Sequence, residues 1–64
     1  MTSYRILDAG LEIEQVSYLP DALRIFHMMD PRPDLRLVSR DSAGQVEDIS
    51  HWPLFDYRPI RVQN

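Results

Sequence analysis

Apolar and polar residues alternate near the start of the chain, which is typical of a half-buried β-strand. Residues 11–14 (LEIE) follow this period of two, and residues 4–7 form a short, mostly apolar segment before them. Residues 8–10 (DAG) are suited to a tight turn between the two segments. The alternation slips at Gln15 and Val16, which marks a bulge or the end of the strand. The beginning of the chain therefore predicts a β-hairpin.

A helical period replaces the alternation in the next segment. Four apolar residues follow the spacing i, i+3, i+4, i+7: Ala22, Ile25, Phe26 and Met29. Leu19 and Leu23 widen this stripe. Pro20 suits the first helical turn, because its missing N–H has no partner there in any case. Residues 30–33 (DPRP) end the helix, since the residue before each proline is driven out of the helical region.

A second hairpin is predicted after the helix. Residues 35–40 and 45–49 are rich in apolar and β-branched side chains, and residues 41–44 (DSAG) connect them. Asp at the first turn position and Gly at the fourth favour a type I turn, with Gly44 in a left-handed conformation at a bulge. Ion pairs across this hairpin are expected between two basic and two acidic residues: Arg36 or Arg40 with Glu47 or Asp48.

The order strand, strand, helix, strand, strand predicts a single small α+β domain over residues 1–64. We expect one helix packed on a mostly antiparallel sheet. The order of the strands within the sheet stays open.

Residues 50–64 differ from the rest of the chain and predict an extended C-terminal aromatic arm. Two prolines in this segment are unsuited to a helix or a central strand. Trp, Tyr and Arg dominate binding hot spots, because they bury a large area at low entropic cost. The candidate partner-binding residues are Trp52, Phe55, Tyr57 and Arg58. Two alternatives stay open, in which the arm folds back to complete a thin core or packs on a second copy of the chain.

Length and composition narrow the range of functions. A chain of 64 residues forms one small core, and its 44% apolar and 27% charged residues are ordinary for a globular protein. There is no cysteine, so disulfides and thiolate metal sites are excluded, and self-association into a homodimer is the expected means of added stability. The net charge of −3 weighs against nucleic acid as the main partner. Without a membrane span or signal pattern, the expected location is cytoplasmic.

The residues that often carry chemistry do not form a recognisable motif. The spacing of His27 and His51 matches no known set of metal ligands. A Ser–His–Asp set could be drawn from Asp48, Ser50 and His51, but no motif of a nucleophilic serine surrounds Ser50. We therefore expect no enzyme, cofactor or metal, unless an oligomer interface builds a pocket that one chain cannot. Glu12 and Glu14 are expected to share one strand face, where a basic partner surface would bind.

These observations favour a non-enzymatic protein-interaction module, namely a small acidic adaptor, inhibitor or regulator that binds a larger protein. Accessory proteins of phages and other mobile elements often have this size and layout, so such an origin is included by analogy alone. The alternative is a small nucleic-acid-binding module. Its contacts would come from arginine and aromatic side chains: Arg36, Arg40, Tyr57, Arg58 and Arg61.

Overall fold

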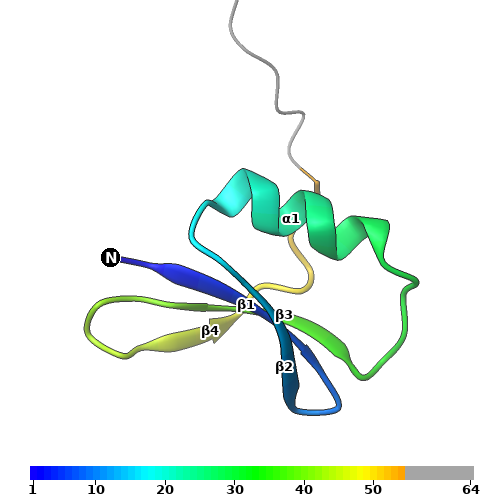
Figure 1. Ribbon diagram of the computed structural model, residues 1–64, viewed down its shortest axis with the longest axis horizontal. Coiled ribbons are helices and arrows are strands. Elements are labelled where there is room, and N and C mark those ends of the chain that lie inside the picture. Colours follow the sequence, from blue (N-terminus) through cyan, green and yellow to red (C-terminus); the bar gives the residue numbers. More distant parts are fainter. Residues whose placement is uncertain (55–64) are drawn as a thin grey trace, which may run out of the picture.

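The four strands and the helix occur in the predicted order in a computed structural model, which describes residues 1–54. The strands are β1 (Ser3–Asp8), β2 (Leu11–Val16), β3 (Leu35–Arg40) and β4 (Val46–Asp48), and the helix is α1 (Leu19–Met28). The strands form one antiparallel sheet in the order β2-β1-β3-β4, and α1 covers one of its faces (Figure 1). The predicted α+β class is confirmed, and the two hairpins join through β1 and β3.

The core lies between α1 and the two central strands. Ile6 and Leu37 are opposite each other in the sheet, and neither is exposed to solvent. Ala22 and Leu23 of α1 lie against them, and burial of a side chain such as leucine contributes about 1.5–3 kcal/mol. The core of the described residues also contains Leu35 and Ile49, and Pro20 at the start of α1 is buried too. The outer part of the predicted helical stripe is half-buried at the margin of this core.

The prolines lie at the two ends of α1, as the sequence predicts. Pro20 lies in the first turn, and the Ala22 N–H donates to the Tyr18 carbonyl at 3.0 Å. Met29 is extended, with φ −82° and ψ 154°, so α1 ends at Met28 just before the Pro-containing segment.

The two hairpin turns both use left-handed backbone. Ala9 and Gly10 have φ of 53° and 84°, as a two-residue type I′ turn requires. Gly44 has φ of 85° and its N–H donates to the Asp41 carbonyl at 3.0 Å. The Asp41 N–H in turn donates to the Gln45 carbonyl at 3.1 Å, which confirms the predicted turn with a glycine bulge.

The expected shared face of Glu12 and Glu14 is wrong. Ile6 is opposite Glu14 and Leu7 is opposite Glu12, so Ile13 is an extra residue between the two pairs. Ile6 and Leu7 are neighbours in β1 and therefore point to opposite faces of the sheet, with Ile6 toward the helix. Glu14, opposite Ile6, thus lies on the helix side, and Glu12, opposite Leu7, lies on the open side. The inserted residue, Ile13, shifts the alternation of the side chains by one position. It lies before Gln15 and Val16, where the sequence pattern predicted a bulge or the end of the strand.

Candidate functional site

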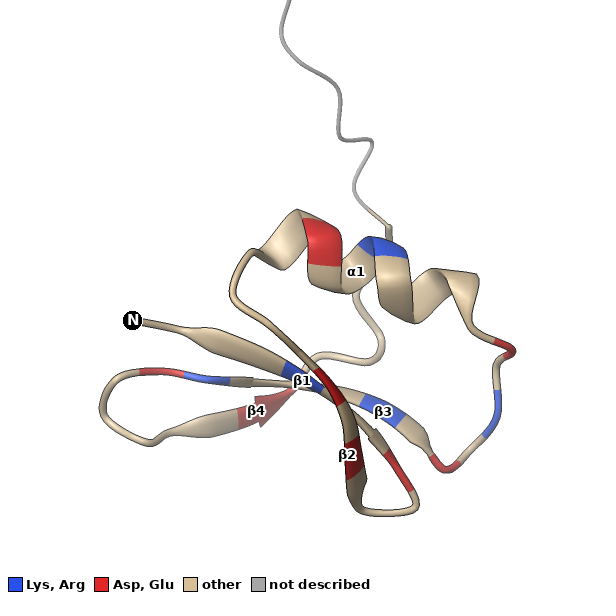
Figure 2. Ribbon diagram, viewed as in Figure 1, with Lys and Arg blue, Asp and Glu red and all other residues tan. Residues whose placement is uncertain are grey.

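The outer edge of β2 is the longest uncovered strand edge among the described residues. β2 has six residues and pairs only with β1, because it ends the strand order. Leu11 is 70% exposed and Ile13 is 41% exposed. Glu12 lies between these two apolar residues in the sequence, and Glu14 follows them. The two glutamates give β2 its acidic character (Figure 2). We call residues 11–15 the β2 edge.

The charges of the β2 edge differ in how far they are neutralised. Arg5 of β1 lies 3.6 Å from a carboxylate oxygen of Glu12, and both side chains are partly exposed. Within residues 1–54, Glu14 has no ion pair. The edge therefore presents a free carboxylate beside exposed leucine and isoleucine side chains.

The opposite edge of the sheet is short. β4 has three residues and pairs only with residues 38–40 of β3. Beyond it, the Ile49 N–H donates to the Leu37 carbonyl at 2.8 Å, and the Leu37 N–H donates to Ser50 Oγ at 2.8 Å. A side chain thus replaces the backbone acceptor that a longer β4 would supply, which explains why the strand predicted over residues 45–49 is shorter.

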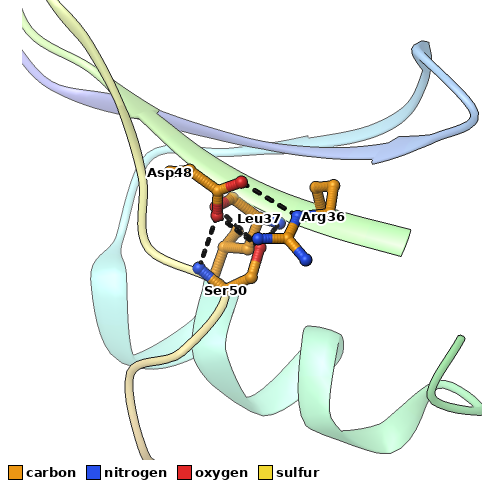
Figure 3. A network of polar contacts seen from close by, with 4 residues as sticks. All are labelled: Arg36, Leu37, Asp48 and Ser50. Atoms are coloured by element: carbon orange, nitrogen blue, oxygen red, sulfur yellow. Dashed lines mark hydrogen bonds and ion pairs between the residues drawn. The ribbon is translucent and has the colours of Figure 1, made fainter. Parts of the chain in front are cut away.

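Arg36, Asp48 and Ser50 form a polar network at the end of β4 (Figure 3). Arg36 Nε donates to Asp48 Oδ2 at 2.9 Å, which confirms one of the expected ion pairs. Ser50 donates both its hydroxyl and its N–H to Asp48 Oδ1, at 2.6 Å and 2.9 Å. In the described part of the chain, His51 forms no hydrogen bond with Asp48 or Ser50. The network therefore closes the end of a strand and does not assemble a Ser–His–Asp arrangement.

The same network shifts the pKa of Asp48. Burial by itself would raise this pKa, but the hydrogen bonds from Ser50 and Arg36 outweigh burial and lower it from 3.8 to about 2. Asp48 is therefore ionised over the whole neutral and mildly acidic range.

The open face of the sheet carries three arginines: Arg5, Arg36 and Arg40. Arg36 and Arg40, which the nucleic-acid alternative invokes, do lie on one face. However, Arg5 and Arg36 are paired with Glu12 and Asp48. No described aromatic residue comes from a strand position on this face, so it lacks the stacking platform that single-stranded nucleic acid requires.

Trp52 is the one predicted partner-binding residue that the structure describes; Phe55, Tyr57 and Arg58 lie outside the described residues, as does Arg61. Trp52 is half-buried and packs against the core. The backbone N–H of Trp52 donates to the Ile49 carbonyl at 3.0 Å, and the backbone carbonyl of Trp52 lies 3.0 Å from His27 Nε2. Trp52 therefore folds back against the core, which is one of the alternatives that the sequence left open for the arm.

His27 has a structural environment of its own. Its ring meets the Phe26 ring edge to face, with centroids 5.7 Å apart and an interplanar angle of 83°. Across residues 1–54, no group of three His, Cys, Asp or Glu side chains is placed to hold a metal ion. Within the same residues, the helix lacks the length and apolar character needed to cross a membrane.

Comparisons with models of known protein families, with curated proteins and with solved structures found no match. The case for a function therefore rests on the geometry of residues 1–54. Sequence reasoning treated the β2 edge as one half of a hairpin and missed its position at the border of the sheet. Knowledge of the strand order is what identifies it.

Proposed function

We propose that this protein is a non-enzymatic interaction protein, a small acidic adaptor, inhibitor or regulator, that binds a larger protein through the β2 edge. The observation that carries this proposal is a six-residue edge strand that no other strand of residues 1–54 covers, with exposed Leu11 and Ile13 beside Glu12 and Glu14. An extended segment of the partner pairs with β2 as a fifth strand.

Backbone hydrogen bonding supports this mode of binding. An edge strand presents unpaired N–H and C=O groups, which serve as a template for another extended chain. Main-chain bonds then supply affinity, and the side chains on either side of the new strand supply selectivity. At about 3.4 Å per residue, the six residues of β2 extend over at most about 20 Å, and the bulge at Ile13 divides this template into two short stretches.

The charges of β2 indicate the chemistry of the partner. Opposite charges on neighbouring strands stabilise pairing, and like charges oppose it. A partner strand with apolar residues and at least one Lys or Arg therefore suits the free Glu14 carboxylate. The net charge of −3 adds long-range attraction for a basic partner surface.

A second copy of the chain is a poorer partner for this edge. If two β2 strands pair antiparallel around Ile13, the two Glu12 carboxylates come together on the open face of the joined sheet, and the two Glu14 carboxylates come together on its helix face. Such like-charge pairs oppose association. We therefore propose that a homodimer, where it forms, uses a different surface. Trp52, Phe55, Tyr57 and Arg58 stay proposed as additional contacts to the larger protein, and a cytoplasmic location stays a prediction.

Selection of peptides from a displayed random library tests the proposal with a defined probe. The wild-type protein is the bait, and the selected peptides are then measured against two charge reversals. Glu14→Lys changes the β2 edge, and Glu47→Lys is a matched control on exposed β4. We expect peptides that combine apolar residues with at least one Lys or Arg, and at least a tenfold loss of affinity for Glu14→Lys alone.

Two results would overturn the proposal. One is a selection that yields no peptide in which apolar residues are combined with Lys or Arg. The other is equal affinity of the selected peptides for wild type and Glu14→Lys. Circular dichroism of each variant verifies that the fold is retained, which is expected because both glutamates are exposed.

A further inference from the structure

A cavity of about 340 Å³ lies away from the β2 edge, between the C-terminal end of α1 and the first residues of β3. This is the part of β3 that β4 leaves uncovered, because β4 pairs only with residues 38–40. Within residues 1–54, four segments contribute to its wall: α1 and its end, the Pro-containing connection, β3, and Ser50, two positions beyond β4.

One side of the cavity is apolar. Leu35 is 3% exposed and belongs to the core, so it forms a rigid surface there. Phe26 and Met29 are half-buried and pack against the same core, and Pro31 completes this side. An apolar group of a ligand can therefore be removed from water at this position.

The other side carries two arginines, each positioned by a carboxylate. Arg32 Nη2 donates to Asp8 Oδ2 at 2.6 Å, and Arg36 Nε donates to Asp48 Oδ2 at 2.9 Å. Neither aspartate lines the cavity. Because a guanidinium has five N–H donors, each arginine keeps donors beyond the one used in these contacts.

Two further polar side chains at the cavity are also positioned. His27 Nε2 lies 3.0 Å from the Trp52 carbonyl. Ser50 donates to Asp48 and accepts from the Leu37 N–H. The polar side of the cavity is thus held in place before any ligand binds, which lowers the entropic cost of binding.

We propose that this cavity binds a small organic monocarboxylate with an apolar body. Among residues 1–54, two arginines and no Asp or Glu line the cavity, so the guanidinium donors that Asp8 and Asp48 leave unused can bind a negatively charged group. The planar fork of arginine matches a carboxylate in particular. The volume is at the lower end of the range of about 300–1,000 Å³ seen for ligand sites, which suits a single ring or a branched alkyl group.

Titration with 3-phenylpropanoate, followed by two-dimensional amide NMR, tests the proposal directly. We expect saturable shifts for Leu35, Arg36 and Ser50, with a Kd on the order of 1 mM or below for a ligand of this size. The neutral analogue 3-phenylpropanamide has the same shape and no charge. We expect it to bind at least tenfold more weakly.

Two arginine substitutions separate the cavity from general charge effects. Arg36→Gln removes a cavity guanidinium, and Arg40→Gln removes the same charge from the same strand outside the cavity. We expect at least tenfold weaker binding for Arg36→Gln and no change for Arg40→Gln. Arg32→Gln provides a second cavity variant should the first fail to fold. The proposal is overturned by absence of saturation, by equal binding of the amide, or by equal affinities of the cavity and control variants.

Discussion

The two edges of the sheet end in different ways. At the β4 edge, the strand stops after three residues, and Ser50 and Asp48 form hydrogen bonds that close the end of the ladder. At the β2 edge, six residues continue to the border of the sheet with Leu11 and Ile13 exposed. β4 thus offers a border of only three residues, and the chain beyond it turns to bond with β3, whereas β2 offers a border of six residues, which is the longer template for a partner strand.

The largest effect that separates the two edges is expected from a pair of isoleucine truncations. Ile49, just beyond β4, is fully buried, so Ile49→Ala removes core packing and leaves a cavity. We expect a loss of about 2–5 kcal/mol in the free energy of unfolding, measured by denaturant titration. Ile13→Ala on the β2 edge is the matched control, with an expected change within about 0.5 kcal/mol. Similar losses for both variants would remove the contrast between the edges.

The next effect concerns the hydrogen bonds that end β4. Ser50→Ala leaves the Leu37 N–H without its side-chain acceptor and removes a donor to Asp48. We expect the free energy of unfolding to fall by about 1–3 kcal/mol, because a buried backbone donor loses its partner. Ser42→Ala in the exposed turn is the control and should change stability by less than about 0.5 kcal/mol. An unchanged melting curve for Ser50→Ala would show that the network does not close this edge.

A smaller effect is expected at the turn that leads into β4. Gly44→Val places a β-branched residue at φ of 85°, where no atom within 4 Å would obstruct the new Cβ. The cost is therefore conformational, and we expect about 1–2 kcal/mol of destabilisation in thermal unfolding. Gly44→Asn should cost less, because asparagine tolerates the left-handed region. Equal costs for the two variants would contradict this explanation.

The smallest effect is the pH dependence of the β4 edge. The pKa of Asp48 is lowered to about 2 in the folded chain, from an ordinary value of 3.8. Its contribution to stability is thus present above pH 3.8 and is lost as the pH falls toward about 2. The stability difference between wild type and Asp48→Asn should therefore shrink over this range. The change is expected to be small, because solvent screens a partly exposed carboxylate. A constant difference would show that the pKa of Asp48 is not lowered by folding.

The strands and the helix could be predicted because their signals are local. The period of two in residues 11–14 and the stripe from Ala22 to Met29 depend only on neighbouring residues, and a strand and a helix form there, with a bulge at Ile13 and the helix end at Met28. The turn at Gly44 also follows local rules. The bulge at Ile13 could not be located in this way, because it is defined by which residue of β1 lies opposite.

The candidate site depends on long-range contacts, which local patterns do not contain. Nothing in residues 11–15 indicates that β2, and not β1, lies at the border of the sheet; the pairing of β1 with β3 decides it. Trp52 is a similar case. Its residue type favours a binding hot spot, but the contact between its carbonyl and His27, 25 positions earlier, places it against the domain.

The central claim is that a partner strand pairs with β2, and interstrand nuclear Overhauser effects in a complex test it most directly. The complex would contain the wild-type protein and the tightest peptide selected against it. We predict Hα–Hα or amide contacts between the peptide and residues 11–16, together with slower amide exchange along β2. Peptide contacts confined to α1, to β4 or to the open face of the sheet would contradict the account.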